Sequence, residues 1–92
     1  MEIRFYIDPE TELPHIYNHQ VQEQEVEEVL FNPGEDRQGR DNSRVAIGQT
    51  YSGRYLKIIY VNDTGSNSIF VITAYDLTGK PLAAYKKRRR KK

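Results

Sequence analysis

The chain has 92 residues, no cysteine and a formal net charge of +1 at pH 7. This length predicts one small domain with a single core, and the lack of cysteine excludes disulfides and thiolate metal sites. No apolar run approaches the ~20 residues of a membrane span, and no signal-peptide pattern is evident, so we expect a cytoplasmic protein.

Charge is distributed unevenly along the chain. Ten acidic side chains and a single basic one, Arg4, lie between Glu2 and Asp36. Residues 86–92 are all Lys or Arg, and the net charge would be negative without them. Such a run can contact nucleic acid or an acidic partner, or it can be a solvated terminus. We expect one domain over residues 1–85, followed by a disordered basic tail.

The first third of the chain predicts one strand and two helical segments. Residues 2–7 alternate apolar and polar side chains, as a strand with one buried face does. Residues 11–20 are weakly helical. In residues 21–31, Val26 and Val29 have the spacing of a buried helix face, and glutamates occupy the solvent face. An Asn-Pro-Gly sequence then predicts the end of this helix.

A polar stretch and three β-rich runs follow. Residues 35–43 are charged and predict either an exposed loop or an edge strand. Residues 45–47, 55–61 and 69–75 are rich in Val, Ile, Tyr, Phe and Thr, and polar, Gly-containing breaks separate them. This pattern predicts an antiparallel meander. A helix that begins near Leu82 then runs into the basic tail.

These elements together predict an α+β fold. We expect an antiparallel sheet of about four strands, with the N-terminal helices packed on one face and a C-terminal helix. Alternation sorts the side chains of each run into two faces, and the more apolar set suits contact with the helices. That leaves Arg44, Lys57, Thr73 and Tyr75 as candidates for one polar surface on the opposite side, and alternation within the third run groups Val71 with Thr73 and Tyr75. Cations neutralise phosphates and tyrosines stack on unpaired bases, although both residue types are also common on ordinary solvated strands.

Two histidines have the spacing of a metal pair. His15 and His19 are four residues apart, and Asp8 or Glu12 would be a third ligand. The alternative is that both histidines are surface or capping residues. We expect no metal site and no other cofactor.

The order of the elements and several short motifs resemble a known family. A His-Gln-Val segment, an acidic helix ending in Asn-Pro, and strands reading RVAIGQT, GRYLKIIY and IFVITAY are similar to the BrnT-type toxins of the RelE/ParE-like superfamily. The resemblance covers about residues 5–85. It implies a small α+β domain and, for toxin members, a metal-independent ribonuclease that cleaves mRNA and is neutralised by a cognate DNA-binding antitoxin.

The resemblance also implies site residues. Arg44, Arg54 and Tyr85 match family positions, and Lys57 joins them because it lies on the same expected surface. Tyr75 stands where BrnT-like chains carry an arginine, and a tyrosine can transfer protons. The candidate catalytic residues are therefore Arg44, Lys57, Tyr75 and Tyr85. The candidate nucleic-acid-binding residues are Arg54, Lys86, Lys87, Arg88, Arg89 and Arg90.

Two hypotheses stand beside a ribonuclease toxin or its descendant. A non-catalytic module of the same fold would bind nucleic acid or an acidic protein with its basic tail. A pure interaction domain would dock a partner strand or helix on its sheet. The expected partners are an antitoxin protein and RNA, with no membrane and no small-molecule cofactor.

Overall fold

The computed structural model of the protein describes residues 2–63, 65 and 67–90. The elements in chain order are β1 (Glu2–Phe5), the 3-10 helix η1 (His15–His19), α1 (Glu23–Phe31), β2 (Glu35–Gln38), β3 (Arg44–Gln49), β4 (Tyr55–Asp63), β5 (Ser68–Asp76) and α2 (Gly79–Arg90). Thr64 and Ser66 of a predicted turn, and Lys91 and Lys92 of the predicted tail, lie outside the described residues. None of the described helices is long and apolar enough to cross a membrane.

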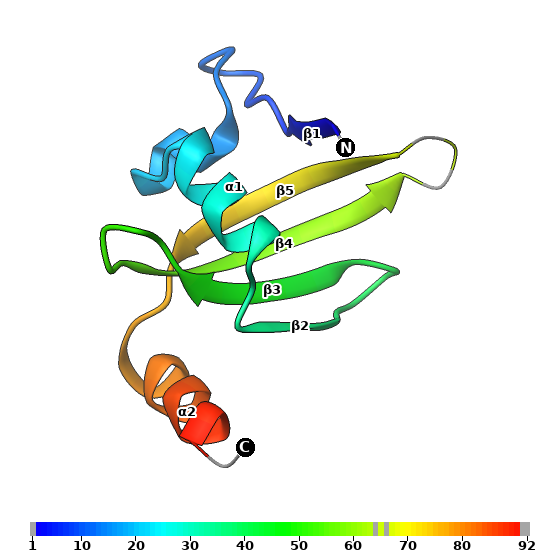
Figure 1. Ribbon diagram of the computed structural model, residues 1–92. Coiled ribbons are helices and arrows are strands. Elements are labelled where there is room, and N and C mark those ends of the chain that lie inside the picture. The colour runs from blue at the N-terminus through cyan, green and yellow to red at the C-terminus, as the bar shows by residue number, and fades with distance from the viewer. Residues whose placement is uncertain (1, 64, 66, 91–92) are drawn as a thin grey trace.

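The protein is an α+β fold on a five-stranded mixed sheet with the strand order β1-β5-β4-β3-β2 (Figure 1). The meander β3-β4-β5 is antiparallel, as predicted, and β2 is an edge strand paired with β3. β1 pairs in parallel with β5, so the prediction of about four antiparallel strands is only partly correct. The alternation within β1 indicates a strand, but it does not encode the direction of a partner more than sixty residues away.

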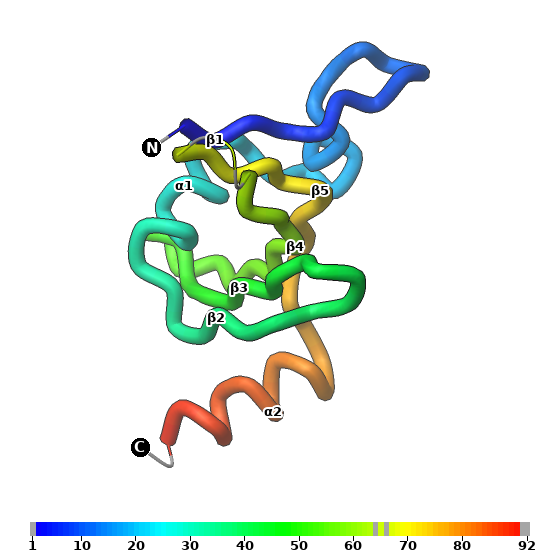
Figure 2. Tube along the Cα trace, turned by 90° about the vertical axis from the view of Figure 1, so that its right-hand side faces the viewer, coloured from blue at the N-terminus to red at the C-terminus, as the bar shows by residue number. Residues whose placement is uncertain are grey.

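The sheet has two faces that pack against different helices. Residues paired directly across antiparallel strands share a face. The first face packs on η1 and α1, and the core there includes Ile16, Val26, Val29, Ala46, Leu56, Ile58, Val71 and Ala74. The second face packs on α2 through a smaller cluster, which comprises Val45, Ile47, Leu77 and Tyr85. Figures 1 and 2 both show β2 and β3 between α1 and α2.

The two N-terminal helical segments differ in how far the prediction holds. α1 forms as expected, because Val26 and Val29 are fully buried, and the backbone N–H of Gln22 donates to Glu25 Oε1 at 2.9 Å in the first turn. The weakly helical stretch at residues 11–20 contracts to the five residues of η1.

A β-bulge in β5 changes which side chains share a face. Ile72 is the extra residue between the pairs Tyr60–Val71 and Ile59–Thr73. The predicted alternation therefore holds on each side of Ile72 but not across it. As a result Val71 faces the first-face core together with Ala74, and it does not share a face with Thr73 and Tyr75, with which strict alternation groups it.

A buried tyrosine and a glycine hold α2 against the second face. Tyr85 is only 5% exposed, and its ring packs edge-on against the ring of Tyr55, with centroids 6.1 Å apart. A Cβ atom on Gly34 would lie 1.9 Å from the Tyr85 hydroxyl oxygen. Glycine at this position therefore lets the helix approach the sheet as closely as it does.

Two cations of α2 bond back to the domain. Arg88 donates to both carboxylate oxygens of Glu35, at 2.7 and 3.0 Å, and Arg89 donates to the Gly34 carbonyl at 2.8 Å. Cations in the last turn also suit the negative end of the helix dipole. These contacts explain why the helix continues through Arg90, where the sequence predicts a disordered tail.

We expect Gly34→Ala to lower the free energy of unfolding by about 1–3 kcal/mol, because the added methyl group overpacks the contact with Tyr85. Urea denaturation measures this loss, and hydrogen exchange should become faster in α2. Gly65→Ala is the matched control, since its Cβ would lie 3.7 Å from Asp63 Oδ1. An unchanged urea midpoint for Gly34→Ala would contradict the packing described here.

Candidate nucleic-acid interface

The structure divides the sequence-predicted site between the two faces of the sheet. Lys57 pairs directly with Tyr75, and the two share the second face, as predicted. Arg44 pairs with Tyr60 of the first-face core, so the prediction of one surface that includes Arg44 is wrong. The reason is register: Arg44 lies three residues from Ile47, the partner of Lys57, and an odd step along a strand reverses the face.

Arg44 belongs to a first-face network that ties the edge strand to the sheet. Its Nε donates to Asp36 Oδ1 at 2.9 Å, and the Tyr60 hydroxyl donates to the other Asp36 oxygen at 2.5 Å. Two effects raise the pKa of Tyr60 to about 12. The larger is burial of the phenol, and the next is its hydrogen bond to Asp36. The bond from Arg44 to Asp36 also raises the pKa of the guanidinium. The network gives Arg44 a structural role.

Arg54 joins three segments on the same side. It donates to Asp76 Oδ1 at the end of β5 and to Glu25 Oε1 of α1, at 2.5 and 3.0 Å. It also donates to the backbone carbonyls of Gln20 and His19, at 2.8 and 3.3 Å. The hydrogen bond from Arg54 lowers the pKa of Asp76. These bonds use most donors of the guanidinium within the fold, whereas the sequence assigns Arg54 to nucleic-acid binding.

The tyrosines of the predicted catalytic set differ in their surroundings. Tyr75 is half-buried, and its ring centroid lies 5.9 Å from that of His19. Tyr85 is buried against the second face, and burial raises the pKa of its phenol. A phenol that resists ionisation is a poor proton acceptor at neutral pH. Tyr85 is therefore a packing residue of α2, and Lys57 with Tyr75 is the pair that the sheet brings together.

A groove of ≈ 660 Å³ opens between α2 and the sheet. The ammonium of Lys86 lies over the Tyr55 ring, 5.1 Å from its centroid, which is a cation–π contact. Sequence reasoning missed Tyr55, although alternation in β4 places it on the same face as Lys57. The polar and aromatic side chains that line the groove are Asn32, Gln49, Tyr55, Tyr85, Lys86, Arg89 and Arg90.

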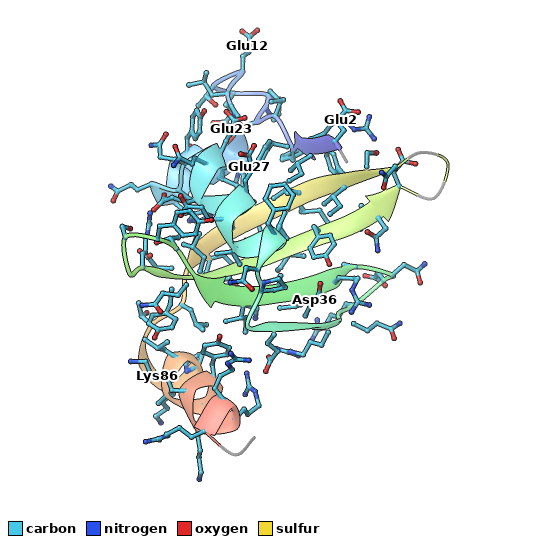
Figure 3. All side chains as sticks on the ribbon, viewed as in Figure 1. Glu2, Glu12, Glu23, Glu27, Asp36 and Lys86 are labelled. Carbon is cyan, nitrogen blue, oxygen red and sulfur yellow. The ribbon has the colours of Figure 1, made fainter. Side chains whose placement is uncertain are left out.

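Charge is segregated between the two sides of the sheet. All five residues at 86–90 are exposed cations on α2. Figure 3 shows Glu12, Glu23 and Glu27 on the side of α1, and Lys86 on α2 across the sheet. The first side is therefore acidic and the side of α2 is basic.

The two histidines form part of an aromatic row. The rings of His15 and His19 pack edge to face with centroids 5.3 Å apart, and Tyr6 and Tyr75 flank them. His15 Nδ1 lies 3.5 Å from Asp8 Oδ2. Within residues 2–63, 65 and 67–90, no group of three or more His, Asp or Glu side chains is placed to hold a metal ion.

The chain matches no protein-family model, no curated protein and no solved structure. The resemblance to BrnT-type toxins therefore stays a prediction. Geometry and charge are the basis for assigning a function to the α2 side.

The Tyr60 network predicts a loss of stability at high pH. The pKa of Tyr60 rises from about 10 in the unfolded chain to about 12 in the fold. The unfolded state releases this proton first, so the stabilisation is complete below about pH 10 and is lost as the pH rises toward about 12. We expect the free energy of unfolding to fall by about 2 kcal/mol over this window.

Denaturant titrations at several pH values measure this effect. The loss should be smaller in Tyr60→Phe, because the titrating phenol is absent. Tyr51→Phe is the control, since Tyr51 is 85% exposed. Identical pH profiles for the native protein and Tyr60→Phe would contradict the assignment.

Proposed function

We propose that the protein is a nucleic-acid-binding module that contacts phosphates with the basic side of α2. The observation that carries this proposal is the segregation of charge, with five exposed cations at residues 86–90 across the sheet from the acidic helix α1. Lys and Arg clustered along one helix form the electrostatic footprint of such proteins. Because α1 repels a polyanion, one orientation of the ligand is favoured.

The anchoring of α2 supports the same proposal. Arg88 is bound to Glu35, and Arg89 is bound to the Gly34 carbonyl. In the described part of the chain, Lys86, Lys87 and Arg90 form no hydrogen bond or ion pair, so their charges are free for phosphates. A helix already fixed in place loses less conformational freedom when it binds.

A metal-independent ribonuclease, as expected of a toxin or its descendant, is the second candidate. The observation that favours it is the pairing of Lys57 with Tyr75 on the second face. A lysine can stabilise charge that develops on a phosphate, and a tyrosine can transfer a proton. RNA cleavage in EDTA that is lost in Lys57→Ala would support this candidate. Intact RNA would reject it and leave the binding module unaffected.

We expect replacement of Lys86, Lys87 and Arg90 by Gln to weaken the binding of a short fluorescein-labelled RNA single strand, while the anchoring bonds of Arg88 and Arg89 stay in place. Each lost phosphate contact leaves counterions on the RNA, so the slope of log K against log salt should become shallower by about 2. Fluorescence anisotropy at several salt concentrations measures both quantities.

A single-charge comparison controls for net charge. Lys86→Gln and Arg4→Gln each remove one cation, but Arg4 lies on β1, at the sheet edge farthest in strand order from β2. We expect only Lys86→Gln to weaken binding clearly. The proposal fails if the triple variant keeps the native salt slope, or if Arg4→Gln weakens binding as much as Lys86→Gln does.

A further inference from the structure

The groove between α2 and the sheet holds an aromatic ring in a fixed position. Tyr55 is half-buried, and the buried Tyr85 packs edge-on against its ring. Lys86 lies over the Tyr55 ring at 5.1 Å from the centroid. Because Lys86 is exposed, and a lysine ammonium sits on a stem with several rotatable bonds, a flat ligand ring can displace its ammonium from the tyrosine.

Cations occupy one wall of this groove. Lys86, Arg89 and Arg90 all line it, and its described lining contains no Asp or Glu. Arg89 uses Nη1 to bind the Gly34 carbonyl, which leaves further guanidinium donors for an anion. A phosphate in the groove would therefore meet several donors and no carboxylate.

Amide side chains supply groups that can recognise a heterocycle. Asn32 and Gln49 line the groove near the sheet. Gln49 Nε2 donates to the Gly53 carbonyl at 3.0 Å, and its amide oxygen is left to accept a hydrogen bond. The volume of ≈ 660 Å³ falls within the range of small-ligand sites.

We propose that this groove binds one nucleotide with an unpaired base, whose ring stacks on Tyr55 and whose phosphate lies among Lys86, Arg89 and Arg90. This inference rests on the proposed function and narrows it, because the ligand must offer a free base plane. Bases inside a duplex are stacked on their neighbours and do not offer one. The nucleotide is either a free nucleoside monophosphate or one unit of a single strand.

The first test compares AMP with ribose 5-phosphate, which carries the same phosphate without a base. NMR titrations of the full chain measure both dissociation constants. We expect AMP to bind about tenfold more tightly, given the usual contribution of base–aromatic stacking. Tyr55→Leu should remove this difference, and a thermal melt confirms that the variant is folded. Tyr51→Leu is the matched control, because Tyr51 is 85% exposed and lies outside the groove lining.

The ratio of the two affinities is the informative readout. If Tyr55 only supported the fold, Tyr55→Leu would weaken both ligands equally and leave the ratio unchanged, which would overturn the inference. Equal binding of AMP and ribose 5-phosphate by the native protein would also overturn it. In that case salt-dependent RNA binding that is lost when Lys86, Lys87 and Arg90 are replaced by Gln would still uphold the proposed function.

A single strand and a duplex of the same RNA sequence distinguish the two sources of the nucleotide. A preference for the single strand that disappears in Tyr55→Leu assigns the groove to one unit of a strand. AMP binding that depends on Tyr55, without any strand preference, assigns it to a free nucleotide. Binding of neither AMP nor RNA would overturn both the inference and the proposed function.

Discussion

Two neighbouring carboxylates on the short edge strand β2 point to opposite faces of the sheet, and each binds residues of the face to which it points. Glu35 pairs with Ile47 and therefore faces α2, where Arg88 binds it; Asp36 faces the opposite way, toward Arg44 and Tyr60. The bonds from Arg88 lower the pKa of Glu35, so the carboxylate stays charged further into the acid range than an ordinary glutamate does. β2 thus anchors the basic helix α2 on the second face, and on the first face it supplies the carboxylate that binds both Arg44 and Tyr60.

The position of α2 follows from this anchor and determines the chemistry of the second side. A helix with five consecutive cations repels itself, and it has little apolar surface beyond Leu82 and Tyr85. Its ion pair with Glu35 and the close approach of Tyr85 to Gly34 offset that repulsion. Once α2 is held there, Lys86, Arg89 and Arg90 border one groove with the Tyr55 ring. Glu23 and Glu27 of α1 lie across the sheet from it (Figure 3).

The local pattern of apolar and polar residues is sufficient to predict most of the helices and strands. The three β-rich runs, the acidic helix and the edge-strand alternative for residues 35–43 all correspond to observed elements, because periodicity and breaks encode them directly. The parallel pairing of β1 and the bulge at Ile72 depend on contacts between distant strands. A pattern read along one strand carries no information about either feature.

The candidate site was predictable only in part for the same reason. Alternation correctly groups Lys57 with Tyr75, since both lie within well-formed strands. It misplaces Arg44, because matching faces between strands requires the register of each hairpin. The run of basic residues predicts a disordered tail, because nothing near it in the sequence shows that Arg88 and Arg89 bind Glu35 and Gly34, more than fifty residues earlier in the chain.

Chemical-shift mapping of a short RNA single strand on the isotope-labelled protein tests the central claim most directly. The largest amide shifts should lie in α2 and at Tyr55 and Gln49 beside it, and α1 and η1 should change little. Shifts concentrated on α1 and the acidic first side, or an absence of saturable shifts at low salt, would contradict a basic, ligand-binding side built by α2.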